Sequence, residues 1–179
     1  MFVLALSAGL YIDYAFKWAR EADPDGKLFY NDTGGEGLGA KSDKVYALVK
    51  GLKDRGVPID GVGLQMHLNL NNPISGKAVL TNLQRLAGLG LDVHITEMDI
   101  QTPLPLTAEK LAGQAAVYQD IWSACTAAPN CKALLTWGVN DGNSWILSFT
   151  PPSNPGLLWD EKYQPKVAHV AASVVLGLH

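Results

Sequence analysis

The feature that most constrains this sequence is a regular alternation of short apolar segments with longer amphipathic ones. Strand-like segments begin near residues 27, 61, 92 and 133, and a helical pattern follows each of them. This alternation is typical of parallel strands joined by crossover helices. We therefore predict an α/β fold of parallel βα units, with residues 1–179 forming a single domain.

The predicted helices have recognisable ends. Ser42 and Thr107 are expected as N-caps, because a side-chain oxygen there can accept a hydrogen bond from the first turn. Gly56 and Gly90 are expected to end two helices. The apolar residues 1–11 lack a basic segment, so we interpret them as the start of the first helix rather than a processed leader. The predicted strands are 27–31, 61–68, 92–100 and 133–139, and the later helices are 42–55, 77–89, 107–127 and 165–176.

Length and composition narrow the function. A complete (β/α)8 barrel usually needs at least about 200 residues, and this chain has 179. Its net charge of −3 argues against a nucleic-acid surface. No apolar run approaches the roughly 18 residues that span a bilayer. Only 17% of the residues are charged and the mean hydropathy is +0.06, so an ordered domain is expected.

Two acidic residues lie where the third strand is expected to end. Glu97 and Asp99 are two residues apart, so regular strand alternation places them on one face. Val93 and Ile95 are expected below them on the same inward face. Ligands bind at the carboxyl ends of parallel strands, and a buried carboxylate is costly unless it is paired or functional.

The second strand presents Gln65 and His67 on one face in the same way. Two interpretations remain open. The acids and His67 form an ion pair that closes the sheet, or Glu97 is a carboxylate nucleophile oriented by His67, Asp99 and Gln65.

Tryptophans follow the last strand. Trp137 closes it, and Trp145 lies in a loop of small polar residues. Flat aromatic faces at the mouth of a sheet can stack on sugar rings, whereas Trp18 and Trp122 are expected to pack from helices. For Trp137 and Trp145, packing against the helices is the alternative interpretation. Trp159 is not assigned to either role.

Cys125 and Cys131 are six residues apart, which suits a loop-closing disulfide worth roughly 2 kcal/mol. Such a bond implies an oxidising compartment, so a secreted, extracellular or periplasmic location is expected, and two free cytoplasmic thiols are the alternative. A metal site is not expected. His94 should face away from Glu97, and His169 and His179 have no H-E-x-x-H pattern.

Several segments together resemble glycoside hydrolase family 10, the endo-1,4-β-xylanases. They occur in the family's order and cover nearly the whole chain from about residue 9. The matching segments are Asp13-Tyr14-Ala15-Phe16, Ala19-Arg20-Glu21-Ala22-Asp23-Pro24, Tyr30-Asn31-Asp32, residues 56–67, Ile95-Thr96-Glu97-Met98-Asp99, residues 137–141 and Ser144-Trp145. The cysteine pair before the last strand is also similar to the family's.

The resemblance implies a TIM barrel that hydrolyses xylan with retention and needs no cofactor. It implies that xylan or xylo-oligosaccharides are the partners. It assigns the nucleophile to Glu97, the network that tunes it to His67 and Asp99, a sugar contact to Gln65, subsite walls to Trp137 and Trp145, and a cleft border to Asn31. Thr33 stands where the family often has an aromatic residue, which puts one stacking contact in doubt.

The resemblance covers strands five to eight only, so we expect a truncated catalytic domain, the C-terminal half of a barrel. In the family, the acid/base Glu follows a Trp-Asp-x-x-Asn stretch on the fourth strand, and this sequence has no such stretch. Glu36 is the only Glu in a loop at the expected active edge. Relatives commonly have a Glu there without that role, so Glu36 is not expected to replace the acid.

A half-barrel would expose two unpaired strand edges and an inward face predicted to carry Val93, Ile95 and Leu135. A homodimer that closes an eight-stranded barrel is the simplest remedy. Three functions then compete: a working xylanase, a carbohydrate-binding half-barrel with little activity, and a partial product without a selected function.

Overall fold

The computed structural model describes residues 10–149 and 153–177. Its centre is a parallel sheet with the strands β1 (Phe29–Asp32), β2 (Gly61–Leu64), β4 (Asp92–Pro103) and β5 (Cys131–Thr136) in that spatial order. A short strand, β3 (His67–Asn69), continues the path of β2 and also pairs with β4 in parallel. The predicted parallel α/β fold is therefore confirmed.

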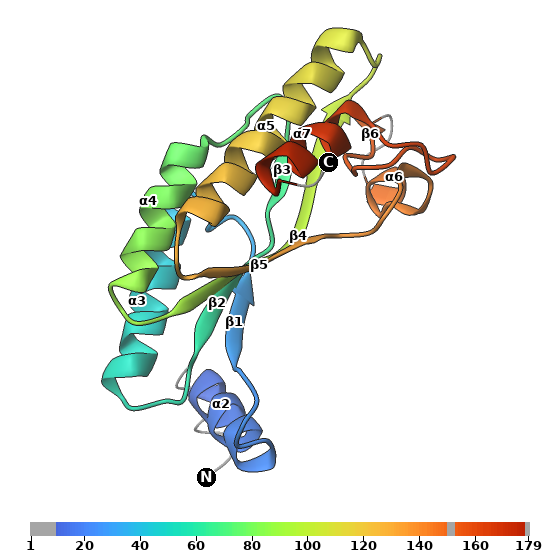
Figure 1. Ribbon diagram of the computed structural model, residues 1–179. Helices are drawn as coiled ribbons and strands as arrows, with labels where there is room; N and C mark the ends of the chain where they lie inside the picture. Colours follow the sequence, from blue (N-terminus) through green and yellow to red (C-terminus); the bar gives the residue numbers. More distant parts are fainter. Residues whose placement is uncertain (1–9, 150–152, 178–179) are drawn as a thin grey trace.

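Helices cover one face of this sheet (Figure 1). The crossover helices are α3 (Ala40–Asp54), α4 (Gly76–Ala87) and α5 (Ala108–Ala127). The last helix, α7 (Val167–Val175), lies against α5. The first helix, α2, spans Tyr11–Ala22, and residues 1–9 of the apolar segment 1–11 lie outside the described residues.

Short elements follow β5. A 3-10 turn, η1 (Asp141–Asn143), leads to the one-turn helix α6 (Ile146–Phe149). Strand β6 (Ser153–Asn154) then pairs antiparallel with the end of β4. These elements lie at the carboxyl ends of the strands, and Trp145 lies between η1 and α6.

The helix ends test the capping predictions. Thr107 is the N-cap of α5, and its side chain accepts a hydrogen bond from the Lys110 amide at 3.2 Å. Gly56 and Gly90 lie just beyond α3 and α4 with positive φ, as expected of residues that end helices. The prediction for Ser42 is wrong, because α3 begins at Ala40. Ser42 sits in its first turn, where the hydroxyl accepts a bond from the Gly39 amide at 2.9 Å.

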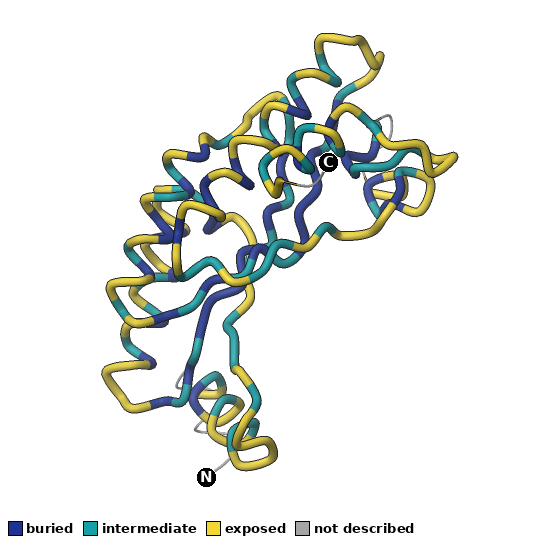
Figure 2. The backbone as a smooth tube through the Cα atoms, in the orientation of Figure 1, coloured by how far each residue is buried: buried dark blue, intermediate teal, exposed yellow. Residues whose placement is uncertain are grey.

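The core lies between the sheet and the helices, and Figure 2 shows β2 and β4 buried along most of their length. Val93 and Ile95 are fully buried in this core with residues of α3, α4 and α5. Their predicted place on the inward face is therefore wrong. Leu135, which is 48% exposed, does lie on the open face. Helices bury only one face of the sheet, so the most apolar positions belong to that face.

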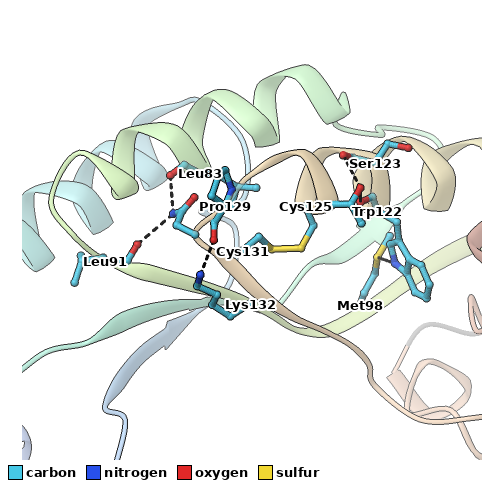
Figure 3. Close-up of a disulfide and its surroundings, with 11 residues drawn as sticks. Leu83, Leu91, Met98, Trp122, Ser123, Cys125, Pro129, Cys131 and Lys132 are labelled. Carbon is cyan, nitrogen blue, oxygen red and sulfur yellow. Dashed lines mark hydrogen bonds between the residues drawn. A yellow bond between two sulfur atoms is a disulfide. The ribbon is translucent and has the colours of Figure 1, made fainter. Parts of the chain in front are cut away.

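The disulfide is present. Cys125 of α5 and Cys131, the first residue of β5, are joined with their Cα atoms 5.3 Å apart. Figure 3 shows the bond closing the turn between the helix and the strand. The last crossover helix is thus covalently tied to the strand that follows it.

None of the helices in residues 10–149 and 153–177 is long and apolar enough to cross a membrane. The same part of the chain contains no group of three His, Cys, Asp or Glu residues able to hold a metal ion.

Candidate active site

A histidine between two carboxylates forms the centre of the site. His67, at the start of β3, places Nε2 3.3 Å from Glu97 Oε2 and Nδ1 3.0 Å from Asp99 Oδ1. Glu97 is 9% exposed and Asp99 is 1% exposed. The structure thus brings together the three residues that the sequence predicted to form one network.

The electrostatics favour a charged imidazole. Burial lowers the pKa of His67, but the hydrogen bonds and negative charges of Asp99 and then Glu97 outweigh it and raise the pKa above its ordinary value. A protonated imidazole has two N–H donors, so it can donate to both carboxylates at once. The charged form therefore stabilises two buried carboxylates that would otherwise repel each other.

A β-bulge in β4 explains how Glu97 reaches the open face. Ile95 pairs with Leu134 and Met98 with Thr136, so β4 advances three residues where β5 advances two. Both Ile95 and Met98 face the helices, and the extra residue turns Glu97 to the opposite side. Glu97 points inward as predicted, but regular alternation from Val93 and Ile95 was the wrong reason.

The bulge also corrects the position of His94. Its ring stacks on Phe29 with the centroids 4.0 Å apart, on the open face of the sheet. The prediction that His94 faces away from Glu97 is therefore wrong, because alternation is interrupted between the two residues. Burial lowers the pKa of His94, so a neutral ring is favoured.

Asn31 contributes more than a cleft border. Its side-chain amide, at the end of β1, donates to Glu97 Oε1 at 2.8 Å. Its carbonyl oxygen accepts a bond from the Thr96 hydroxyl at 2.9 Å. The two carboxylate oxygens of Glu97 thus have separate neighbours, Asn31 on one and His67 on the other.

Trp145 also has a role that its sequence position did not indicate. Its indole N–H donates to Asp99 Oδ2 at 2.7 Å. Its ring meets His67 edge-on at 5.0 Å. Trp145 therefore helps to fix the Asp99–His67 pair, in addition to any contact with a ligand.

An open cavity of about 480 Å³ lies in front of this network. It is lined by Thr33, Gln65, His67, Trp137, Trp145 and Phe149. Trp137 is 49% exposed, so a broad aromatic surface is available to a ligand. Sequence reasoning missed Phe149, whose ring lies 5.3 Å from that of Trp145, because it falls in a one-turn helix without a pattern of its own.

Parallel βα units that place functional side chains at the carboxyl ends of their strands are the architecture of TIM-barrel enzymes. The sequence profile of glycosyl hydrolase family 10 matches residues 5–174. The chain belongs to this family.

Individual relatives support the same family assignment. The chain is 43% identical over 162 residues to endo-1,4-beta-xylanase B of Thermotoga neapolitana, covering 90% of this chain and 46% of the relative. Native xylanase 10B from Thermotoga maritima superposes with a TM-score of 0.89 at 43% identity, over 93% of this chain and 52% of that one. Xylanase 10B from Thermotoga petrophila, solved with xylobiose, gives 0.90 at 42% identity, over 93% and 51%.

The chain therefore spans about half the length of the relatives that it matches. Family 10 enzymes are TIM barrels, and the four parallel βα units described above correspond to half of such a barrel.

Proposed function

We propose that this chain supplies the nucleophile side of a retaining site that cleaves β-1,4-xylan. The observation that carries the proposal is the placement of Glu97. Its carboxylate is held by Asn31 and His67 at the carboxyl end of β4, beside a cavity with tryptophan walls. One carboxylate oxygen attacks the anomeric carbon, and the bond to the leaving oxygen breaks to give a glycosyl ester.

Neighbouring residues prepare this carboxylate. Asn31 donates to Oε1 and His67 lies at Oε2, so rotation of the group is restricted. Asp99 balances the charge on His67 and is itself fixed by Trp145. Holding a nucleophile in one orientation lowers the entropy that must be lost in the transition state.

The cavity and the relatives support the proposed substrate class. Trp137 and Trp145 offer flat faces for sugar rings, and Gln65 offers an amide that can hydrogen-bond to hydroxyls. A relative with 42% identity was solved with xylobiose. We therefore assign xylan and xylo-oligosaccharides as ligands, with no cofactor.

The proton donor is the open part of this proposal. Retaining glycosidases use a second carboxyl group about 5 to 5.5 Å from the nucleophile. Neither an Asp nor a Glu is among the cavity-lining residues that the described part of the chain contributes. Glu36 does not fill this role, because its carboxylate accepts backbone hydrogen bonds from Gly34 and Met66. The acid/base must come from outside these residues.

The test therefore uses a substrate that needs little acid assistance. With a dinitrophenyl 2-fluoro-xylobioside, Glu97 displaces dinitrophenolate, and the fluorine slows hydrolysis of the ester. We expect the mass of one 2-fluoro-xylobiosyl group on the peptide that contains Glu97, and no label on Glu97→Gln. Labelling of another residue, or no labelling at saturating reagent, would overturn the nucleophile assignment.

A second candidate function is a weakly active xylo-oligosaccharide-binding half-barrel that associates with a second copy. In the described ranges, β1 pairs only with β2 and β5 only with β4, so both outer strands keep open edges. Two copies related by a two-fold axis would pair each β1 with the other copy's β5 and give eight parallel strands.

Light scattering after size exclusion at micromolar concentration distinguishes these states. A mass of about twice 19.2 kDa supports the dimer. A monomer that acquires xylanase activity only when a separate N-terminal family 10 half is added identifies that half as the partner and refutes the dimer. Binding of xylotriose without labelling of Glu97 favours the binding function.

The disulfide supports an oxidising compartment, so we also propose a secreted or periplasmic location. One relative, the xylanase from Thermoanaerobacterium saccharolyticum, is described as intracellular. Thiol labelling of protein recovered from its native source tests the proposal, because two blocked cysteines are expected and two free ones would contradict it.

A further inference from the structure

Glu36 is a buried carboxylate that the proposed reaction does not use. It lies in the loop between β1 and α3 and is 6% exposed. Its Oε1 accepts a hydrogen bond from the Gly34 amide at 2.9 Å and another from the Met66 amide at 3.2 Å. The side chain thus ties its own loop to the break between β2 and β3.

Met66 has an unusual backbone. Its φ is +67°, in the left-handed region that an unbranched residue other than glycine seldom adopts. The Met66 amide is bound by Glu36, and its carbonyl accepts a bond from the Asp99 amide at 3.3 Å. Its side chain is fully buried. The conformation is therefore held from both sides by polar groups and anchored by packing.

This kink matches the bulge in the neighbouring strand. Leu64 pairs with Ile95 and His67 pairs with Asp99, so the β2–β3 path advances three residues while β4 advances four. The extra residue in β4 accounts for this difference, and Met66 lies where the β2–β3 path leaves one register with β4 and enters the next. The two residues that flank it, Gln65 and His67, both line the cavity.

The loop itself is attached to α4. The amide of Asn82, a fully buried residue, donates to the Gly35 and Glu36 carbonyls at 2.9 and 3.1 Å. Arg85 donates to the Asn82 carbonyl oxygen at 2.9 Å. The backbone of Glu36 is therefore held in place by α4, and the Glu36 side chain in turn binds the Met66 amide.

We propose that Glu36 is a positioning residue, whose reach to the Met66 amide sets the kink that aims Gln65 and His67 into the cavity. The effect of Glu36 on catalysis rests on the proposed function. Its effect on the Met66 backbone and on the position of His67 does not. The geometry requires an acceptor oxygen at the length of a Glu side chain, and it does not require the negative charge.

Three substitutions of Glu36 distinguish the effect of its side-chain length from the effect of its negative charge. Glu36→Gln keeps an acceptor oxygen at the same distance and loses the charge. Glu36→Asp keeps the charge and shortens the side chain by one methylene. Glu36→Ala loses both, and circular dichroism shows whether it folds. If it does not, the first two variants still decide the question.

The readout is the pH titration of the His67 ring by NMR, assigned with His67→Gln. In the wild-type chain the contacts with Asp99 and Glu97 raise the pKa of His67. We expect Glu36→Gln to keep the wild-type value. We expect Glu36→Asp and Glu36→Ala to lower it toward about 6.5, because a relaxed kink moves the ring away from both carboxylates.

Two results would overturn the inference. If Glu36→Asp keeps the wild-type titration while Glu36→Gln lowers it, charge rather than reach is what matters. If all three variants titrate like the wild type, Glu36 has no positioning role. Failure of the labelling reagent on the wild-type chain refutes the proposed function alone, since the titration measures no turnover.

Discussion

The side chain of Asn31 crosses an entire strand to reach Glu97. Asn31 lies on β1 and Glu97 on β4, with β2 between them, yet the amide and carboxylate are 2.8 Å apart. Gly63 of β2 makes the crossing possible, because a Cβ at that position would lie 2.3 Å from Asn31 Oδ1. Every residue larger than glycine there would displace the amide that holds Glu97.

The first prediction concerns this crossing. Gly63→Ala should push Asn31 away from Glu97 and destabilise the fold by about 1–3 kcal/mol, as overpacking does. Urea unfolding measures the stability, and the side-chain NH2 resonance of Asn31 reports the lost hydrogen bond.

Gly113→Ala, in α5, is the matched glycine-to-alanine control. A Cβ at Gly113 would lie 3.5 and 3.8 Å from the two methyl groups of Leu70, which is ordinary van der Waals contact. The substitution should stabilise the chain by about 0.5–1 kcal/mol, because alanine favours a helix interior over glycine. An unchanged Asn31 side-chain resonance in Gly63→Ala would contradict the prediction that a Cβ at position 63 displaces Asn31 from Glu97.

The second prediction tests the aromatic wall. Trp137→Ala should weaken binding of xylotriose about 5- to 50-fold by calorimetry, because stacking on an exposed indole is lost. Trp18→Ala is a matched control on α2, with 47% exposure against 49% for Trp137. Equal weakening in both variants would show that the effect is not local to the cavity.

The third prediction uses the disulfide. Reduction of Cys125–Cys131 should lower the free energy of unfolding by about 2 kcal/mol, the chain-entropy value for so short a loop. Urea unfolding with and without dithiothreitol measures the change. The double variant Cys125→Ala with Cys131→Ala should not respond to the reductant, and a response would reveal another cause.

The fourth prediction concerns the attachment of α2. Arg55 donates two hydrogen bonds of 2.8 Å to the Asp13 carboxylate. These bonds, opposed by burial, lower the pKa of Asp13. The stabilisation is therefore complete above the ordinary pKa of Asp, about 3.9, and is lost as the pH falls through the lowered value.

Asp13→Asn should accordingly reduce Tm by about 2–4 °C at pH 7, and the difference from wild type should shrink in strong acid. Asp54→Asn breaks only the exposed Lys50–Asp54 pair of α3 and should leave Tm almost unchanged. A difference for Asp13→Asn that stays constant with pH would show that charge is not responsible.

Patterns that act over a few residues could be predicted from the sequence. The strand–helix alternation gave the parallel sheet, because each element's period depends only on its own residues. Thr107 was identified as an N-cap because its hydroxyl binds an amide three residues away. Ser42 has the same local character, but the chain enters the helix two residues earlier at Ala40, so it serves in the first turn.

The features that aim the site depend on contacts between distant residues. The bulge after Ile95 and the left-handed Met66 leave no trace in the apolar pattern, which continues through both. Glu36 holds Met66 from 30 residues away, and Asn31 reaches Glu97 from 66 residues away. Candidate residues could thus be named from sequence, whereas the faces of Val93, Ile95 and His94 could not.

The covalent link between α5 and β5 sets the direction in which the sheet loosens. In the part of the chain that the structure describes, β5 has one hydrogen-bonded neighbour strand, and the disulfide fixes it at Cys131, its amino end. We therefore expect opening of β5 to start at its carboxyl end, at Thr136, next to Trp137. Amide hydrogen exchange along β5 should quicken from Cys131 toward Thr136, so the backbone that carries Trp137 should be the part of β5 that adapts most readily to a ligand.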